Sequence, residues 1–112
     1  MARDTLQGTL DILVLKTLAR GPEHGYGITC HILNASDQHL RVEEGSLYPA
    51  LRRMETAGLI KAEWKASENN RKARFYELSR RGREQLRAEV TTWERYVRAV
   101  SKALAAASPL PA

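Results

Sequence analysis

Residues 45–58 read GSLYPALRRMETAG, and this stretch decides how the rest of the chain is interpreted. Ser46 can act as the N-cap of a short helix because its hydroxyl can accept a hydrogen bond from a free backbone N–H. Pro49 then falls in the first turn, where its missing N–H costs nothing. Gly58 can adopt the left-handed conformation that ends a helix, with Leu59 packing back onto it. The stretch therefore predicts a short helix with a defined start and end.

The predicted helix has two different faces. Leu47, Leu51 and Met54 recur at helical spacing and predict a buried stripe, whereas Tyr48 and Arg52 fall on the solvated side. A short helix that offers a phenol and arginines on one side has a size that fits a DNA major groove. A surface helix without any partner shows the same pattern, and this stretch alone fits both interpretations.

Two strand-like segments follow the helix. Residues 60–65 alternate apolar and polar side chains, and residues 74–78 do so more loosely. The polar loop between them contains Asn69 and Asn70, which tolerate positive φ angles. We therefore predict a mainly α fold with a small β-wing (α+β), that is, a winged helix-turn-helix with a recognition helix at 46–58 and a wing at 60–78.

These segments resemble compact members of the PadR family of transcriptional regulators. The resemblance extends from about Leu6 to about Val100. Its motifs are Gly21-Pro22, His24-Gly25-Tyr26, Glu44 to Glu55, Gly58-Leu59-Ile60, Arg74 to Ser79 and Gly82-Arg83. It implies DNA contacts by Tyr26, Ser46, Tyr48 and the basic residues of the wing, and a dimer formed through the C-terminal helix with help from the first. Since some members bind flat aromatic compounds between subunits, it also implies a possible effector pocket at Trp93.

The charge of the chain is concentrated in the predicted wing and just after it. The chain has 18 Lys and Arg against 13 Asp and Glu, a net charge of +5 and a pI near 9.7. Residues 61–83 contain eight basic and three acidic side chains, which equals the net charge of the whole chain. This distribution favours a polyanionic partner.

Cysteine content and hydropathy indicate a cytoplasmic protein. Cys30 is the single cysteine, which excludes an intramolecular disulfide and fits a reducing compartment. The sequence shows neither a signal-peptide pattern nor an apolar run approaching the roughly 18 residues that would span a bilayer.

Two helices are predicted before the recognition helix. The first should begin after an N-cap at Asp4 and end near Ala19, and it is apolar on more than one side, so we expect it to contact a second subunit as well as its own domain. A support helix should span residues 25–35, with Ile28, Ile32 and Ala35 facing inward. Residues 39–43 should form a short strand that pairs with the wing.

The C-terminal helix carries a second periodic signal. It should begin after Ser79 and end near Ala105, and its large apolar residues are spaced by 4, 3, 4, 3 and 4, as in a coiled coil. Such a seam would promote aggregation if exposed, so we expect a homodimer. The predicted interface comprises Leu6, Ile12, Leu15, Leu86, Val90, Trp93, Val97, Val100 and Leu104. The predicted organisation is a DNA-binding domain at 1–78, a dimerisation helix at 79–105 and a flexible tail at 106–112.

These features predict a homodimeric regulator, most simply a repressor, that binds a palindromic operator in double-stranded DNA. The start of the support helix, the side-chain hydroxyls and the cations of the wing would contact phosphates. Arginines of the recognition helix would contact guanine edges, and the wing tip would lie at a minor groove. The predicted DNA-contacting residues are Gly25, Tyr26, Ser46, Tyr48, Arg52, Arg53, Lys61, Lys65, Asn69, Asn70, Arg71, Lys72 and Arg74.

Other functions have weaker sequence support. A winged helix can also serve as a protein–protein adaptor whose basic wing docks an acidic partner. An enzyme is not expected, because His24, His31 and His39 lack carboxylates at metal-ligand spacing and no phosphate-binding or nucleophile motif is present. We expect neither a cofactor nor a metal. For Cys30 a packed thiol is a commoner role than a redox sensor, and for Trp93 a seam position is commoner than an effector contact.

Overall fold

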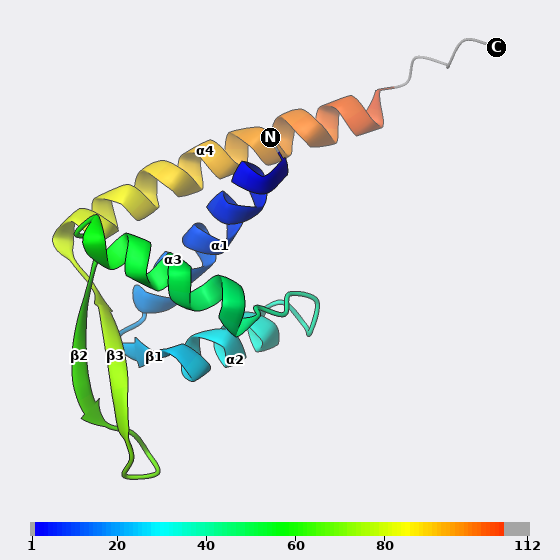
Figure 1. The fold of residues 1–112 in the computed structure, drawn as a ribbon. Helices are drawn as coiled ribbons and strands as arrows, with labels where there is room; N and C mark the ends of the chain where they lie inside the picture. Colours follow the sequence, from blue (N-terminus) through cyan, green and yellow to red (C-terminus); the bar gives the residue numbers. More distant parts are fainter. Residues whose placement is uncertain (1, 107–112) are drawn as a thin grey trace.

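Helices dominate the computed structural model, which describes residues 2–106 and the side chains from Gly8 to Ala106 (Figure 1). The helices of this part of the chain are α1 (Ala2–Leu18), α2 (Gly25–Ala35), α3 (Glu44–Thr56) and α4 (Arg80–Ala105). The strands are β1 (Glu23–His24), β2 (Ile60–Ala66) and β3 (Lys72–Leu78), and they form one antiparallel sheet in the order β1-β3-β2. The predicted winged helix-turn-helix is confirmed.

The core lies where α1, α2, α3, the base of the sheet and the start of α4 meet. The predicted stripe of α3 is confirmed, because Leu47, Leu51 and Met54 are all buried. Leu15 and Leu86 are also buried in this core, which corrects their assignment to a dimer interface. Both side chains complete the core within one protomer, because α4 packs on α1.

The end of α3 follows the prediction, but its start does not. Gly58 has a φ angle of 79°, and the N–H of Leu59 donates to the carbonyl of Met54 at 2.9 Å, which is a Schellman ending. The helix begins at Glu44, so Ser46 lies inside it and is not the N-cap. Pro49 therefore falls in the second turn rather than the first.

The region before α3 also differs from the prediction. Residues 39–43 form no strand, and β1 pairs with β3 instead, with Glu23 opposite Tyr76 and His24 opposite Phe75. The loop from α2 to α3 turns through consecutive positive φ angles at Asp37 and Gln38, and the N–H of His39 donates to the carbonyl of Ser36 at 3.1 Å, so the turn extends into the first of these residues.

The start of α1 and the last residue of α2 need smaller corrections. α1 already includes Asp4, which is therefore not its N-cap, whereas its end at Leu18 agrees with the predicted end near Ala19. Ala35 is exposed, whereas Ile28 and Ile32 are buried as predicted.

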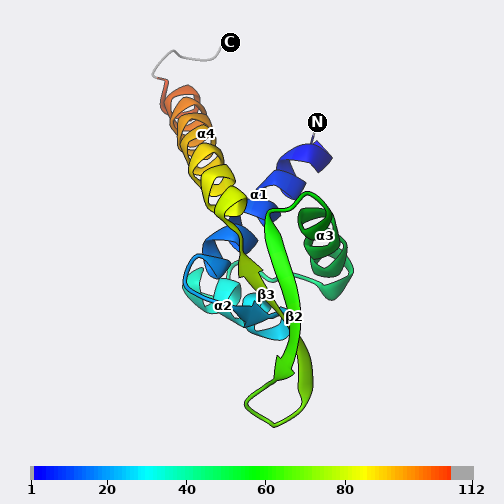
Figure 2. The same ribbon diagram turned by 90° about the vertical axis from the view of Figure 1, so that its left-hand side faces the viewer.

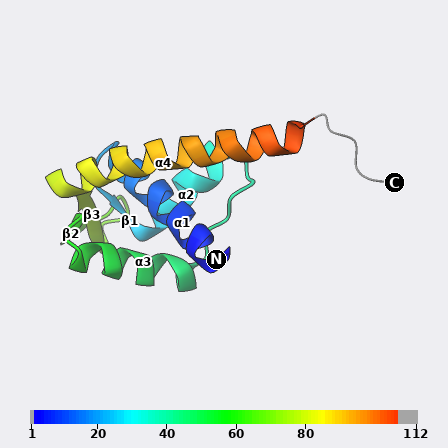
Figure 3. The same ribbon diagram turned by 90° about the horizontal axis from the view of Figure 1, so that it is seen from above.

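A long helix, α4, extends away from this core. Figures 2 and 3 show that only its first half lies against the rest of the protomer, while its second half projects beyond it. The molecule consequently measures 63 × 28 × 22 Å along its principal axes. The predicted cap is confirmed: the Ser79 hydroxyl accepts a hydrogen bond from the N–H of Gly82 at 3.0 Å.

Gly82 sets how closely α4 approaches the end of α3. A Cβ at this position would overlap the backbone carbonyl of Leu59, which cannot move easily because it also accepts hydrogen bonds from Ser79. We expect Gly82→Ala to lower the free energy of unfolding by about 1–2 kcal/mol, because overpacking outweighs the roughly 1 kcal/mol gained in helix propensity. Urea denaturation measures this change.

Gly45→Ala is the matched control for this substitution. Gly45 is also helical, but a Cβ there meets nothing within 4 Å, so its replacement should leave stability unchanged or slightly raised. Equal stability of the two variants would contradict the proposed packing of Gly82.

Candidate nucleic-acid interface

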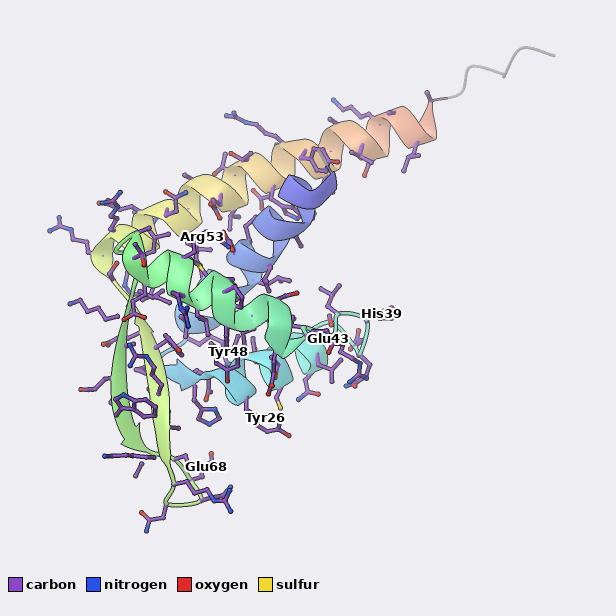
Figure 4. All side chains as sticks on the ribbon, in the orientation of Figure 1. Tyr26, His39, Glu43, Tyr48, Arg53 and Glu68 are labelled. Carbon is purple, nitrogen blue, oxygen red and sulfur yellow. The ribbon has the colours of Figure 1, made fainter. Side chains whose placement is uncertain are left out.

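The start of α2, the exposed side of α3 and the inner face of the wing surround one groove of about 840 Å³. Tyr26 from α2, Tyr48 from α3 and Arg71 and Lys72 from the wing all line it. Figure 4 shows Tyr48 below α3, Tyr26 at the lower side of α2 and Glu68 at the wing tip. Segments that are far apart in the sequence thus meet around a single concave surface.

The first turn of α2 is built so that its backbone can approach other groups closely. His24 is the N-cap, and its Nδ1 accepts a hydrogen bond from the N–H of Gly27 at 3.0 Å. The imidazole ring rests edge-on against Phe75 of β3, with 5.1 Å between ring centroids. A Cβ at Gly25 would overlap the phenol of Tyr48, so glycine allows α2 and α3 to come together here. The sequence did not reveal the capping role of His24, because imidazole is an uncommon cap.

Two phenols project from this surface into solvent. Tyr26 is 73% exposed and Tyr48 is 43% exposed. A hydrogen bond with the Cys30 side chain raises the pKa of the Tyr26 hydroxyl. Both phenols can donate a hydrogen bond to an anionic oxygen. Cys30 is partly exposed and lines the same groove.

The adjacent arginines of α3 have different surroundings. Arg52 is exposed and forms no ion pair within the described part of the chain. Arg53 donates two hydrogen bonds to the carboxylate of Asp11 on α1, at 2.8 and 2.9 Å. These bonds raise the pKa of Arg53, and Figure 4 shows its side chain above α3, on the opposite side from Tyr48. Arg53 thus joins α3 to α1, outside the groove.

The wing distributes its cations over two faces. Arg74 lies on the inner face and pairs with Glu55 of α3 at 3.0 Å, and Lys72 lines the groove near the tip. Lys61 and Lys65 instead line a separate hollow on the outer face, and Lys65 lies 3.6 Å from Glu63. The structure therefore does not bring Lys61 and Lys65 together with the other predicted contacts.

The tip of the wing is a tight polar turn. Asn70 has a φ angle of 58°, as the Asn-Asn pair predicted, and its N–H donates to the carbonyl of Ser67 at 2.8 Å. Asn69, Asn70 and Arg71 are all exposed. Ser46 is also exposed, but it lies near the start of α3 beside a different hollow, one shared with the loop before α3.

An apolar strip runs along the second half of α4. Trp93, Val97, Val100 and Leu104 are exposed, whereas Val90 packs partly against the core. Tyr96, which lies outside the predicted 4-3 spacing, is 51% exposed, and its ring centroid lies 5.9 Å from that of Trp93. The side chain of Leu6 and residues 107–112 of the predicted tail lie outside the described residues.

A hollow of about 390 Å³ separates α1 from α4 beside this strip. Ile12 of α1 lines it together with Trp93 and Tyr96 of α4. Glu89 also lines it: one carboxylate oxygen accepts a hydrogen bond from Gln85 at 3.0 Å, and the other is buried without a hydrogen-bond partner among the described residues. The hollow is therefore mainly aromatic and apolar, with one acceptor left unpaired.

Comparisons with known proteins agree with this geometry. Residues 14–88 match the Transcriptional regulator PadR-like family. A padr family transcriptional regulator from Eggerthella lenta is 30% identical with a TM-score of 0.74, and the match covers 94% of this chain and 89% of that one. A PadR-like transcriptional regulator from Bacillus cereus is 28% identical with a TM-score of 0.77, covering 92% and 98%. A transcriptional regulator from Clostridium thermocellum is 26% identical with a TM-score of 0.79, covering 88% and 96%.

None of the helices in the described part of the chain combines the length and apolar character that crossing a membrane requires.

Proposed function

Because this chain belongs to the PadR-like family of transcriptional regulators, which are not enzymes, we propose that it is a homodimeric repressor that binds a palindromic DNA operator sequence-specifically. The observation that carries the proposal is the groove bounded by α2, α3 and the wing, where two exposed phenols and the basic wing tip converge. Arg52 is exposed on α3, one helical turn after Tyr48. Since its partner would be genomic DNA, the proposed location is the cytoplasm.

Each part of the groove has a role that suits its chemistry. The hydroxyls of Tyr26 and Tyr48 would donate to phosphates and fix the register of the complex, with the backbone at Gly25 close enough to join them. Arg52 would read a guanine edge in the major groove. Asn69, Asn70, Arg71 and Lys72 would reach the neighbouring minor groove and its phosphates.

Five predicted contacts take more limited roles in this proposal. Arg53 and Arg74 are each engaged by a carboxylate, so they would mainly orient α3 and the wing. Lys61 and Lys65 lie on the outer face and would contribute only long-range attraction. Ser46 would meet a phosphate at the start of α3.

The apolar strip of α4 supports the dimer. We propose that a second copy covers Trp93, Val97, Val100 and Leu104, with Val90 and Ile12 at the edge of the contact. Twofold symmetry would place two copies of α3 on one side of the duplex, so the half-sites should be separated by about one or more helical turns. In this proposal residues 1–78 act as the DNA-binding domain and residues 79–105 as the dimerisation helix.

A small aromatic effector is proposed for the hollow beside Trp93. The rings of Trp93 and Tyr96, which are tilted by 38° to each other, would contact a flat ring, and the oxygen of Glu89 that has no partner among the described residues would accept a hydrogen bond from it. Fluorescence titration of Trp64→Phe, which leaves Trp93 as the reporter, should show saturable quenching by such a compound. Linear quenching across a panel of aromatic compounds would exclude the site.

Lys72→Ala should weaken binding to all DNA sequences about equally. Lys72 lies at the wing tip on the groove and would contact a phosphate, which carries no sequence information. The slope of log affinity against log salt concentration should fall by about one. Fluorescence anisotropy with an operator and an unrelated duplex, each at several salt concentrations, measures both quantities.

Retention on DNA separates this proposal from the adaptor alternative. A DNA-binding regulator should bind duplexes from its own promoter region, with affinity that declines steeply as salt increases. An adaptor that recognises an acidic protein would show no preference among duplexes. Sequencing the genomic fragments that the protein selects would identify the operator, and failure to select any fragment would refute the proposal.

A further inference from the structure

Trp64 occupies an unusual position on the inner face of the wing. In the register of β2 and β3, Ile60 lies opposite Leu78, Ala62 opposite Tyr76 and Trp64 opposite Arg74. Because side chains alternate between faces, residues 60, 62 and 64 share the face that starts in the core. Ile60 is only 2% exposed, whereas Trp64 is 59% exposed. Thus the face of β2 that is buried in the core at Ile60 is still apolar at Trp64, where the rest of the domain no longer covers it.

The indole of Trp64 is held in place but not covered. The guanidinium of Arg74 lies 5.7 Å from the centre of the ring, and Arg74 is in turn fixed by Glu55 of α3 at 3.0 Å. Within the described residues the indole N–H has no hydrogen-bond partner. A single exposed apolar side chain is ordinary. This one differs because it lines the groove that Tyr26, Tyr48 and Lys72 also line.

The chemistry of this position matches a sugar–phosphate backbone. An indole offers a flat apolar face, which can pack against a deoxyribose, and one N–H, which can donate to a phosphate oxygen. Glu55 neutralises the charge of Arg74, so Arg74 mainly orients the indole and adds little net charge to the site. We propose that Trp64 is a DNA-contacting residue that packs against the backbone of the duplex and contributes affinity independent of base sequence. This inference rests on the proposed DNA-binding function.

Intrinsic fluorescence and affinity together test the inference. The wild-type protein contains two tryptophans, Trp64 and Trp93, so the emission missing from Trp64→Phe belongs to Trp64. That component should be quenched by an operator and by an unrelated duplex alike. Trp64→Ala should weaken binding to both duplexes by about tenfold, while Trp64→Phe, which keeps a ring but lacks the N–H, should lose about threefold.

Glu63→Gln is the matched control, because Glu63 is the neighbouring residue on the outer face of β2. It should not weaken binding to either duplex. Thermal denaturation should show that all three variants remain folded, since both side chains are exposed.

The outcomes distinguish this inference from the proposed function. If the wild-type protein binds DNA but Trp64→Ala binds equally well, the inference is wrong and the function stands. If Trp64→Ala loses affinity for the operator alone, the ring reads a base and the backbone assignment is wrong. If the wild-type protein binds neither duplex, the proposed function fails, and the inference fails with it.

Discussion

Val97→Asp is expected to convert the protein into a monomer at micromolar concentration and to lower its affinity for a two-half-site duplex by about a hundredfold or more. Val97 lies in the apolar strip of α4 between Trp93 and Val100, all of which are exposed in the protomer. If a second copy covers this strip, twofold symmetry would bury two unpaired carboxylates, which is strongly unfavourable. Loss of the dimer would remove the gain in affinity from binding two half-sites at once.

Size-exclusion chromatography with light scattering and operator titrations measure the two effects. Thr91→Asp is the control, because this substitution adds the same charge at an exposed position of α4 outside the strip. It should remain dimeric and bind the operator normally. A dimeric Val97→Asp variant with normal affinity would show that the strip is not the interface.

Arg52→Ala is expected to reduce discrimination between the operator and an unrelated duplex by about 10–100-fold. The side chain is exposed on α3 and has no carboxylate partner in the described part of the chain, so it is available for two hydrogen bonds to a guanine. A bidentate contact of this kind contributes about 1–3 kcal/mol of discrimination. Affinity for unrelated DNA should change much less, because only one positive charge is lost. Competition binding with both duplexes measures the ratio.

Arg53→Ala provides the contrast, since it removes the neighbouring arginine with the same change in charge. Its guanidinium is bound by Asp11, so the substitution should lower the free energy of unfolding by up to about 1 kcal/mol and leave discrimination intact. If Arg53→Ala loses discrimination and Arg52→Ala does not, the assignment of the reading side chain to Arg52 is wrong.

Features set by local sequence were predictable. The bounds of α4, the end of α3 and the wing strands were predicted to within a residue or two. The signals were the cap at Ser79, the stop at Gly58 and the periodic apolar residues, and each of them depends on neighbours a few positions away. The start of α3 was predicted two residues late, because Ser46 has the side chain of a good cap but lies inside the helix. Caps that use no side chain leave no such signal in the sequence.

Features set by distant contacts were not predictable. Arg52 and Arg53 are adjacent in the sequence, and nothing nearby predicts that Arg53 pairs with Asp11, which lies 42 residues away. β1 was not predicted because its two residues form a strand only by pairing with β3, which follows the recognition helix in the sequence. Leu86 fits the periodic pattern of α4 as well as Val97 does, and Leu15 lies off the main apolar stripe of α1. Both are buried within the protomer because α4 packs on α1, a contact between distant segments.

Sedimentation equilibrium of the intact chain at micromolar concentration, alone and with an operator duplex, tests the central claim most directly. The claim is that two copies associate through α4 and present two recognition helices to DNA. It predicts a free species of twice the 12.6 kDa protomer mass and a complex with two protomers on each duplex. A folded 12.6 kDa monomer that binds DNA singly, or not at all, would contradict it.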